Sequence, residues 1–299
     1  MNHNKFILIL LVNFFVYLPA WATQILPYKD NLKIEKPGLI AICCVFQHEA
    51  AWLKEWIEFH RMIGVEHFYL YNNLSNDDYL SVLQPYISKG IVELYDYPHE
   101  SFDQRHQIHL YNHALKLAKA DQIEWLAIID TDEFITPMDC NSLKKVLKQY
   151  KFFPGVSIQW LMFGTSNVDH LKEGQLMIEQ LVYRAPEKEH ANIFVKPIVQ
   201  PQLTKRSISP HECTFHNKAF GIDLPIKIVR INHYYFRTEE FLHNVKIPRI
   251  RKRFQLGTNN VCSDTTILKF RPVANSVLDD TMERFIKPLK KRVFRLDVP

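Results

Sequence analysis

Two aspartates one residue apart, Asp130 and Asp132, directly follow a short apolar run at residues 125–129, and Glu133 comes next. The run predicts a buried strand, and side chains at positions i and i+2 of a strand point the same way. Both aspartates can therefore bind one cation if the chain bends just past the strand. Carboxylate oxygens suit Mg²⁺ or Mn²⁺, which usually take further ligands from water and from a substrate phosphate. The pattern predicts a metal–diphosphate site, although paired aspartates are also typical of turns and helix starts.

Strands and helices alternate in the first half of the chain. Continuous apolar runs predict strands that are covered on both faces, and apolar residues at helical spacing predict the helices between them. The strands are expected at residues 39–46, 67–71, 91–97 and 125–129, and the helices at 49–63, 77–88 and 104–120. Helical connections of this length favour right-handed crossovers and a parallel sheet. We therefore expect an α/β fold whose acidic cluster ends the fourth strand, where such folds place ligands.

The second half is less regular. It predicts strands at 156–160, 193–199 and 226–236, which we expect to form a mixed or antiparallel sheet packed on the first half, and a final helix at about 238–254. The chain then divides into a first half at 37–150, a second half at 151–270 and a basic C-terminal tail at 271–299.

The N-terminus has the order of a targeting segment. Lys5 precedes an apolar run at 6–18, and the sequence Pro-Ala-Trp-Ala at 19–22 offers a small-residue cleavage site. Residues 1–22 therefore predict a secretory signal peptide, with an uncleaved membrane anchor as the alternative. Under either interpretation the protein enters the secretory pathway, exported or membrane-anchored, and residues 23–36 form an extended lead-in.

Composition sets wide bounds. The 299 residues are 47% hydrophobic and 23% charged, which is ordinary for a globular protein with a full core. The formal charge of +5 is mild and fits an anionic ligand or a membrane surface. We expect no nucleic-acid partner. Five cysteines without a C-x-x-C pair argue against a zinc site.

Several polar and aromatic segments are spaced between about residue 39 and residue 253. They are Phe46-Gln-His-Glu49, 53–60, 68–75, Asp130-Thr-Asp-Glu-Phe134, 160–166, Asn232-His-Tyr-Tyr235 and 237–241. In this order they resemble glycosyltransferase family 92 and related family-2-like bacterial glycosyltransferases, which have the GT-A fold. His48 and Asn72 depart from the family pattern, which has Asn and Asp at these places. The resemblance implies that the first half binds a nucleotide sugar and that the second half binds the acceptor.

The resemblance also implies roles for individual residues on the donor side. Asp132 would bind Mn²⁺ or Mg²⁺ directly, Asp130 would contact the ribose, the ion or its water, and His233 would be a third ligand. The residues expected to contact uracil, ribose or diphosphate are Glu49, Asn72, Asn73, Ser75 and Arg237.

Four of these positions also have a structural interpretation. Glu49 suits the first turn of a helix, where the helix dipole favours a carboxylate. Asn73 and Ser75 suit a simple turn. His233 suits a hydrogen-bonded place beside aromatic residues.

On the acceptor side, the resemblance points to Trp160 and His211. Trp160 would stack on a sugar face, and a buried aromatic is the equal alternative. An inverting displacement at the anomeric carbon needs a base for the acceptor hydroxyl, and Asp169 and Glu212 are the candidates.

The function predicted from these features is that of a metal-dependent, inverting glycosyltransferase. It would move a sugar, with galactose favoured, from a UDP-linked donor to a glycan or another hydroxyl acceptor. A non-catalytic carbohydrate-binding protein on the same fold is the alternative. A hydrolase that uses the same carboxylates is third, because the acidic cluster follows the fourth strand and not the first.

Overall fold

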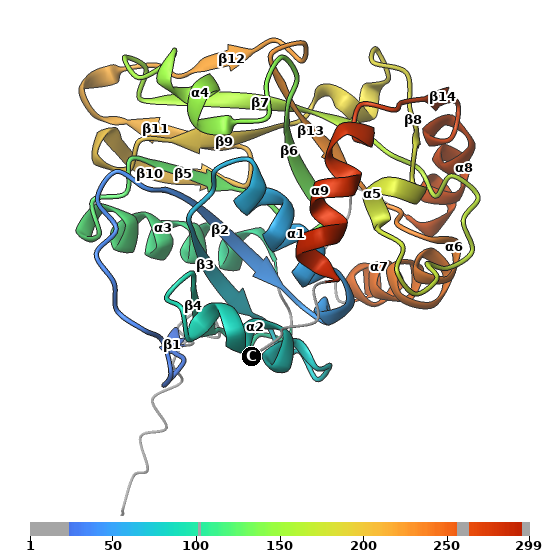
Figure 1. Cartoon of the computed structure of the whole chain (residues 1–299), viewed down its shortest axis with the longest axis horizontal. Coiled ribbons are helices and arrows are strands. Elements are labelled where there is room, and N and C mark those ends of the chain that lie inside the picture. The colour runs from blue at the N-terminus through green and yellow to red at the C-terminus, as the bar shows by residue number, and fades with distance from the viewer. Residues whose placement is uncertain (1–23, 101–102, 256–262, 295–299) are drawn as a thin grey trace, which may run out of the picture.

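The first half of the molecule is the α/β unit that the sequence predicts. The computed structural model describes residues 24–100, 103–255 and 263–294. Four parallel strands lie in the order β4-β3-β2-β5, with a short antiparallel strand β1 on the outer edge (Figure 1). These elements are β1 (Leu26–Pro27), β2 (Ile40–Phe46), α1 (Ala50–Met62), β3 (His67–Asn72), α2 (Tyr79–Ile87), β4 (Val92–Asp96), α3 (Gln104–Ala120) and β5 (Trp125–Ile128).

The second half continues the same sheet. We expected a mixed or antiparallel sheet packed on the first half. The strands do pair in both senses, but they extend the first sheet instead of packing on it, because β9 pairs antiparallel with both β5 and β7 and thereby joins the halves. The sheet runs on as β5-β9-β7-β13-β6, and β12 pairs with β7. These strands are β6 (Glu133–Pro137), β7 (Gly155–Met162), β9 (Val195–Val199), β12 (Ile222–Leu224) and β13 (Val229–His233).

The acidic motif occupies the turn between β5 and β6. Only residues 129–132 separate these two strands, yet β9, β7 and β13 lie between them in the sheet. β6 pairs antiparallel with β13, so that His233 lies opposite Glu133. The motif thus sits where the chain leaves the first half and crosses to the far edge of the sheet.

Helices cover both faces of the sheet. The side chains of β2 alternate between two cores: Ile42 and Cys44 face the core under α1, whereas Ala41 and Cys43 face the core under α3. The core under α1 also contains residues of α2, α4 (Leu143–Lys148) and α9 (Glu283–Val293). The smaller elements are α5 (Met177–Gln180), β8 (Tyr183–Arg184), β10 (Thr204–Ser209), β11 (Glu212–Phe215) and single turns at His190–Ile193, Pro201–Leu203 and His216–Lys218.

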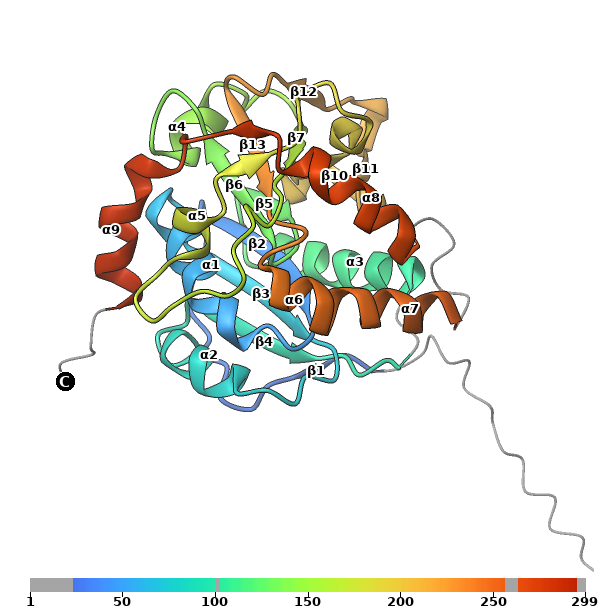
Figure 2. The ribbon, with the colours of Figure 1, turned by 90° about the vertical axis from the view of Figure 1, so that its right-hand side faces the viewer.

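The helix predicted at 238–254 is present but is not the last one. It consists of α6 (Glu239–Phe241), a π-helical segment (Leu242–Lys246) and α7 (Ile247–Gln255), which run on as one helix (Figure 2). Thr238 caps its start, where the side-chain oxygen accepts a hydrogen bond from the Phe241 amide. π-Helical turns inside helices frequently occur at functional sites.

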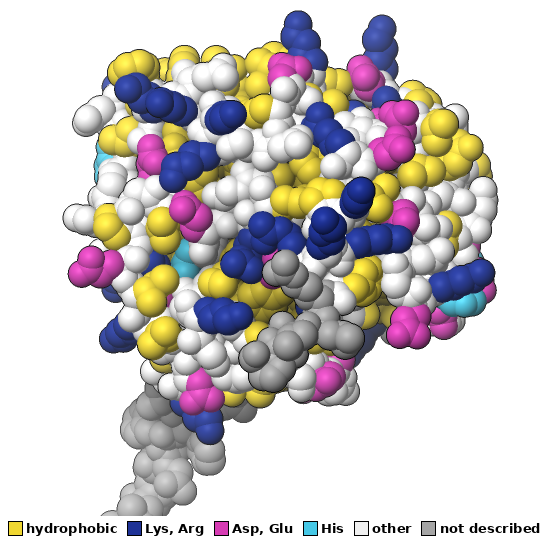
Figure 3. All heavy atoms as spheres, viewed as in Figure 1, with side chains coloured by type: hydrophobic (Ala, Val, Ile, Leu, Met, Phe, Trp, Pro, Cys, Tyr) yellow, Lys and Arg dark blue, Asp and Glu magenta, His cyan; other side chains and the backbone are white. Residues whose placement is uncertain are grey.

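The expected basic tail is, in its described part, an element of the fold. It includes the end of α8 (Asp264–Ala274), β14 (Val277–Leu278) and α9. Phe285 and Leu289 of α9 are buried, and α9 packs along α1 (Figure 1). The sequence prediction missed this because basic residues cover the outer side of α9. Figure 3 shows Lys and Arg side chains gathered over the middle of this face.

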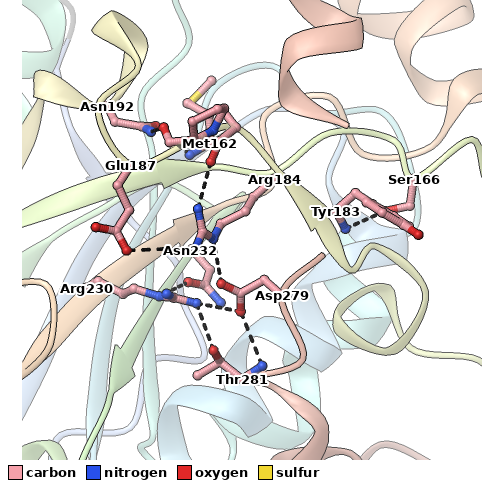
Figure 4. Close-up of polar contacts among 12 residues, drawn as sticks. Met162, Ser166, Tyr183, Arg184, Glu187, Asn192, Arg230, Asn232, Asp279 and Thr281 are labelled. Atoms are coloured by element: carbon pink, nitrogen blue, oxygen red, sulfur yellow. Dashed lines mark hydrogen bonds and ion pairs between the residues drawn. The ribbon is translucent and has the colours of Figure 1, made fainter. Parts of the chain in front are cut away.

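Asp279 anchors this C-terminal part to the sheet (Figure 4). Its carboxylate accepts hydrogen bonds from Arg184 of β8 at 2.6 Å and from Arg230 of β13 at 2.7 Å. The Thr281 amide donates a third, at 3.2 Å. Burial works to raise the pKa of Asp279, but these partners outweigh it and lower the pKa to about 2.

Asp279→Asn is expected to lower the free energy of unfolding by about 3–5 kcal/mol, because it removes the carboxylate that pairs with the buried Arg230 and the half-buried Arg184. The pKa is lower in the folded state than in the unfolded state. The stabilisation from Asp279 is therefore present above the unfolded-state pKa of about 3.9 and is lost as the pH falls towards 2. Urea unfolding at pH 7 and pH 3 measures both effects. The exposed neighbour Asp280 provides the matched control, Asp280→Asn, and equal stabilities of the two variants at pH 7 would contradict the assignment.

The targeting prediction for residues 1–22 lies outside the described residues. Within the ranges that the structure describes, no helix is both long enough and apolar enough to cross a membrane.

Candidate functional site

One cleft opens at the carboxyl ends of the parallel strands and brings together six of the predicted site residues. They come from both halves of the sequence: Glu49, Asn73, Asp130, Asp132, Trp160 and His233. Gln47, Gln107 and Thr131 also line the cleft, and the helix that contains the π-helical segment closes it with Lys246, Arg249 and Ile250. The cleft is therefore the candidate site for the metal and diphosphate that the acidic motif predicts.

Asp132 lies between two basic side chains. Its carboxylate is 3.4 Å from His233 Nε2 and 3.4 Å from Lys246 Nζ. Burial works to raise the pKa of Asp132, but His233 and Lys246 hold it well below its usual range. Burial lowers the pKa of His233 against the opposing effect of Asp132. The geometry therefore pairs an ionised carboxylate with a neutral imidazole.

Asp130 faces a different cation. Its carboxylate is 2.7 Å from the Nζ atom of Lys196, a β9 residue that the sequence analysis missed. Lys196 Nζ is also 3.3 Å from Glu133, whose carboxylate accepts a hydrogen bond from the Asp130 amide. The signal for Lys196 was its position as a lone charge inside the apolar run predicted at 193–199.

We expected the two aspartates to share one site. Instead, Asp130 faces Lys196, whereas Asp132 faces His233 and Lys246. Among the described residues, no set of three or more His, Cys, Asp or Glu side chains is arranged to hold a metal ion. Asp132 and His233 nevertheless offer a carboxylate oxygen and a ring nitrogen side by side, and both are ordinary ligands of Mn²⁺. This pair fits a divalent ion that takes its remaining ligands from a bound diphosphate and water.

The turn after β3 divides its predicted residues between structure and cleft. Asn72 donates hydrogen bonds to Tyr79 and Asp96 and accepts one from the Ser75 amide, and it does not line the cleft. The Ser75 hydroxyl accepts a hydrogen bond from the His48 amide. Asn72 and Ser75 thus hold the turn, as the structural interpretation predicts for Ser75. Asn73 accepts a hydrogen bond from the His99 amide and also lines the cleft.

Arg237, which was predicted to contact a diphosphate, is buried and does not line the cleft. Its side chain is 1% exposed and packs against the rings of Trp52 and Phe241, with the guanidinium carbon 4.8 and 4.7 Å from their centroids. It forms an ion pair with Glu49 and donates a hydrogen bond to Thr131 at 3.3 Å. Arg237 therefore supports the acidic turn from the protein interior.

Lys246 and Arg249 are the basic residues that reach the cleft. Lys246 lies 3.5 Å from the centroid of the Tyr235 ring, and Arg249 lies 3.5 Å from the Glu49 carboxylate. Neither residue is predicted from the sequence. A run of charges at a helix end, such as the one that begins at Arg249, usually lies in solvent. Only the fold shows that one side of this helix faces the acidic motif.

The predicted acceptor side is partly assembled. The Trp160 ring packs on the His233 ring, with 4.4 Å between centroids, and on the His211 ring at 5.4 Å. His211 donates a hydrogen bond to the Val195 carbonyl and lines a neighbouring pocket instead of the cleft. Trp160 is thus the one predicted acceptor residue that touches the cleft.

Neither predicted base lies in the cleft. The Asp169 side chain is 82% exposed, and its contact is with His170 at 3.2 Å. Glu212 is an exposed residue of the β10–β11 hairpin and faces the same neighbouring pocket as His211. Both predictions rested on residue type, because sequence alone does not place loop residues relative to a strand end.

Comparison with known proteins identifies the family. The model of glycosyltransferase family 92 matches residues 39–275, which is most of the chain. The chain belongs to glycosyltransferase family 92. Two family 92 proteins, from Ricinus communis and from Oryza sativa subsp. japonica, are 27% and 26% identical over 219 and 212 residues. The aligned stretches cover 71% and 69% of this chain but 38% and 34% of those proteins, so the chain spans less than half the length of these family 92 relatives.

Solved structures with low similarity include two complexes with a nucleotide or a nucleotide sugar. S. aureus TarS in complex with UDP is 13% identical, with a TM-score of 0.36, and the match covers 62% of this chain and 60% of that one. The mannosyltransferase PcManGT from Pyrobaculum calidifontis, in complex with GDP-Man and Mn²⁺, is 12% identical, with a TM-score of 0.38 and coverage of 86% and 74%. The family 92 assignment and the sheet order, with the acidic motif after the fourth strand, confirm the expected α/β fold of GT-A type.

Proposed function

We propose that this family 92 protein is a metal-dependent glycosyltransferase. It would use a UDP-linked sugar, with galactose favoured, and transfer it to a glycan or another hydroxyl acceptor. The observation that carries the proposal is the contact of Asp132 with His233 in a cleft that Lys246 and Arg249 close. One cleft thus offers ligands for a divalent ion and cations for a diphosphate.

The residues of the cleft would have three roles: they would hold the metal ion, contact the diphosphate and orient the nucleoside. Asp132 and His233 would hold Mn²⁺ or Mg²⁺, and the bound ion supplies Lewis-acid stabilisation of charge on the departing diphosphate. Lys246 and Arg249 would contact the diphosphate oxygens and stabilise the same charge. Asn73 and Glu49 lie towards the ends of β3 and β2 and would orient the nucleoside.

On the acceptor side, Trp160 lines the cleft but neither predicted base does. Trp160 would stack on a sugar ring at the wall that it shares with His233. Inversion requires a base near the acceptor hydroxyl. For Asp169 or Glu212 to serve, the loop or hairpin that carries it would have to approach the cleft when the acceptor binds.

The position of these two carboxylates favours one rival function. A cleft that binds a nucleotide sugar or a glycan but has no base at the acceptor would belong to a carbohydrate-binding protein without turnover. Asp169 and Glu212 both lie outside the cleft, and this observation favours the carbohydrate-binding protein.

The proposed location follows from the first residues of the chain. We propose that residues 1–22 direct the protein to the secretory pathway as a signal peptide or a membrane anchor, because Lys5, the apolar run and the small-residue site come in that order. An anchor that faces a compartment supplied with nucleotide sugar would give the enzyme its donor.

A panel of nucleotide sugars tests the function directly. The purified protein is incubated with UDP-galactose, UDP-glucose, UDP-GlcNAc and GDP-mannose in Mn²⁺ or in EDTA, and released nucleotide is measured alongside calorimetric UDP binding. We expect release to depend on Mn²⁺ and to be fastest with UDP-galactose. UDP should bind about tenfold tighter or more in Mn²⁺, because an ion that bridges the diphosphate contributes several kcal/mol. Equal UDP affinity in Mn²⁺ and EDTA would contradict the proposal.

A further inference from the structure

Lys196 is a buried charge directly beneath the acidic motif. Its side chain is 1% exposed, and it lies in β9, paired with Ile158 of β7. A buried ammonium group is costly unless it is paired, and Lys196 is paired twice, with Asp130 and Glu133. Burial alone would lower the pKa of Lys196, but these carboxylates raise it above its usual value. Lys196 therefore keeps its positive charge next to the acidic motif.

The contacts of Lys196 close the acidic turn on itself. The same Glu133 oxygen that faces Lys196 accepts a hydrogen bond from the Asp130 amide at 2.9 Å, and the Asp130 carboxylate returns to Lys196. The Glu133 side chain is fully buried, so that this end of the ring is fixed. Asp130 is thereby held towards β9, whereas Asp132 is held towards β13 and Lys246.

We propose that Lys196 is a positioning residue that withholds Asp130 from the divalent ion, so that the protein binds this ion through Asp132 and His233. The inference rests on the proposed function, since it assigns the ligands of the same cleft. The Asp130 oxygen that faces Lys196 is 2.7 Å from a buried ammonium group, which offsets the charge that this carboxylate could offer to a metal and holds it towards β9. Lys196 also offsets the negative charge of Asp130, which would otherwise repel an incoming diphosphate.

Weak binding of the bare ion is the expected consequence. Affinity for hard cations rises with the number and charge of the ligands, and two protein ligands leave most positions of the ion to water. The diphosphate of the donor then supplies the missing oxygens. Metal and donor would therefore bind together, and Lys196 is the residue that couples them.

The test measures Mn²⁺ binding to the full-length protein without nucleotide, by electron paramagnetic resonance of free Mn²⁺ or by calorimetry. Lys196→Met removes the charge and frees Asp130, and we expect Mn²⁺ to bind at least about tenfold tighter than to the wild type. Lys196→Arg keeps the charge and should bind Mn²⁺ as the wild type does. The double variant Lys196→Met with Asp130→Asn should return to the wild-type affinity.

Lys36 offers a matched control. It is another buried lysine that bridges two carboxylates, with Asp121 at 2.8 Å and Glu93 as its partners, and it does not line the cleft. Lys36→Met should therefore lower stability about as much as Lys196→Met and leave Mn²⁺ affinity unchanged. An equal Mn²⁺ affinity for wild type, Lys196→Met and Lys36→Met overturns the proposal.

Two further measurements keep the test decisive. If Lys196→Met does not fold, Asp130→Asn and Asp132→Asn are compared in the otherwise wild-type chain with Mn²⁺ and UDP present. The proposal expects the Asp132 variant alone to weaken Mn²⁺ binding, and an equal loss in both overturns it. Failure of the proposed function is distinct, since it would appear as absent UDP binding and absent donor turnover in the wild type, whatever Lys196→Met does to Mn²⁺ alone.

Discussion

Asp132→Asn is expected to lower donor turnover by about 10²–10³-fold, which is the usual effect of removing one electrostatic contact at a developing charge. Asparagine keeps the size of the side chain and loses the negative charge that faces His233 and Lys246 at 3.4 Å. The variant should therefore fold and lose its hold on the ion. Initial rates of nucleotide release from UDP-galactose in Mn²⁺ measure the effect, with thermal unfolding as the check on folding.

Asp280→Asn is the matched control for this measurement, because Asp280 is an exposed aspartate outside the cleft. It should retain the wild-type rate. The same experiment separates a catalyst from a sugar-binding protein. A wild type that turns over no donor, yet still binds glycans in EDTA, would establish the rival function and exclude the transferase.

The first half of the fold could be predicted closely because its signals are local. The buried strands appear as continuous apolar runs, and α1 appears as aromatic residues at helical spacing that end near Gly64. Gly64 does adopt a positive φ of 107°, as a helix stop of this kind requires. The place of the acidic cluster then followed from the order of the elements, since strands of a parallel sheet end at a common edge.

The rest depends on contacts between distant residues. That β9 joins the two halves is a matter of strand pairing, which the run at 193–199 does not specify. The burial of Arg237 depends on two rings, from α1 and α6, and on the Glu49 carboxylate, which only the fold brings together. The family resemblance gave its place in a motif and implied a diphosphate contact. Lys196 and Lys246 were missed for the opposite reason, because each is a single charge whose partner is more than 60 residues away.

His233→Ala carries the second large expected effect. We expect it to weaken Mn²⁺-dependent UDP binding by about 10–100-fold or more, because losing even an outer partner of a metal site costs about that much. UDP binding in EDTA should hardly change. His211→Ala is the matched control, since His211 packs on the same Trp160 ring but lines a different pocket, so that even an acceptor-side role leaves UDP binding intact.

The pH dependence of this binding gives an independent check on His233. Burial lowers the pKa of His233 below its ordinary value of 6.5, although Asp132 opposes the shift. The imidazole is therefore neutral at pH 7 and can bind a metal, and protonation removes it as a ligand only below pH 6.5. Calorimetric titrations of UDP in Mn²⁺ should show a steeper loss of affinity below pH 6.5 for the wild type than for the His233 variant, which keeps only the loss caused by protonation of the terminal phosphate of UDP. If His233→Ala and His211→Ala bind UDP equally well in Mn²⁺, His233 is a packing partner of Trp160 and not a metal ligand.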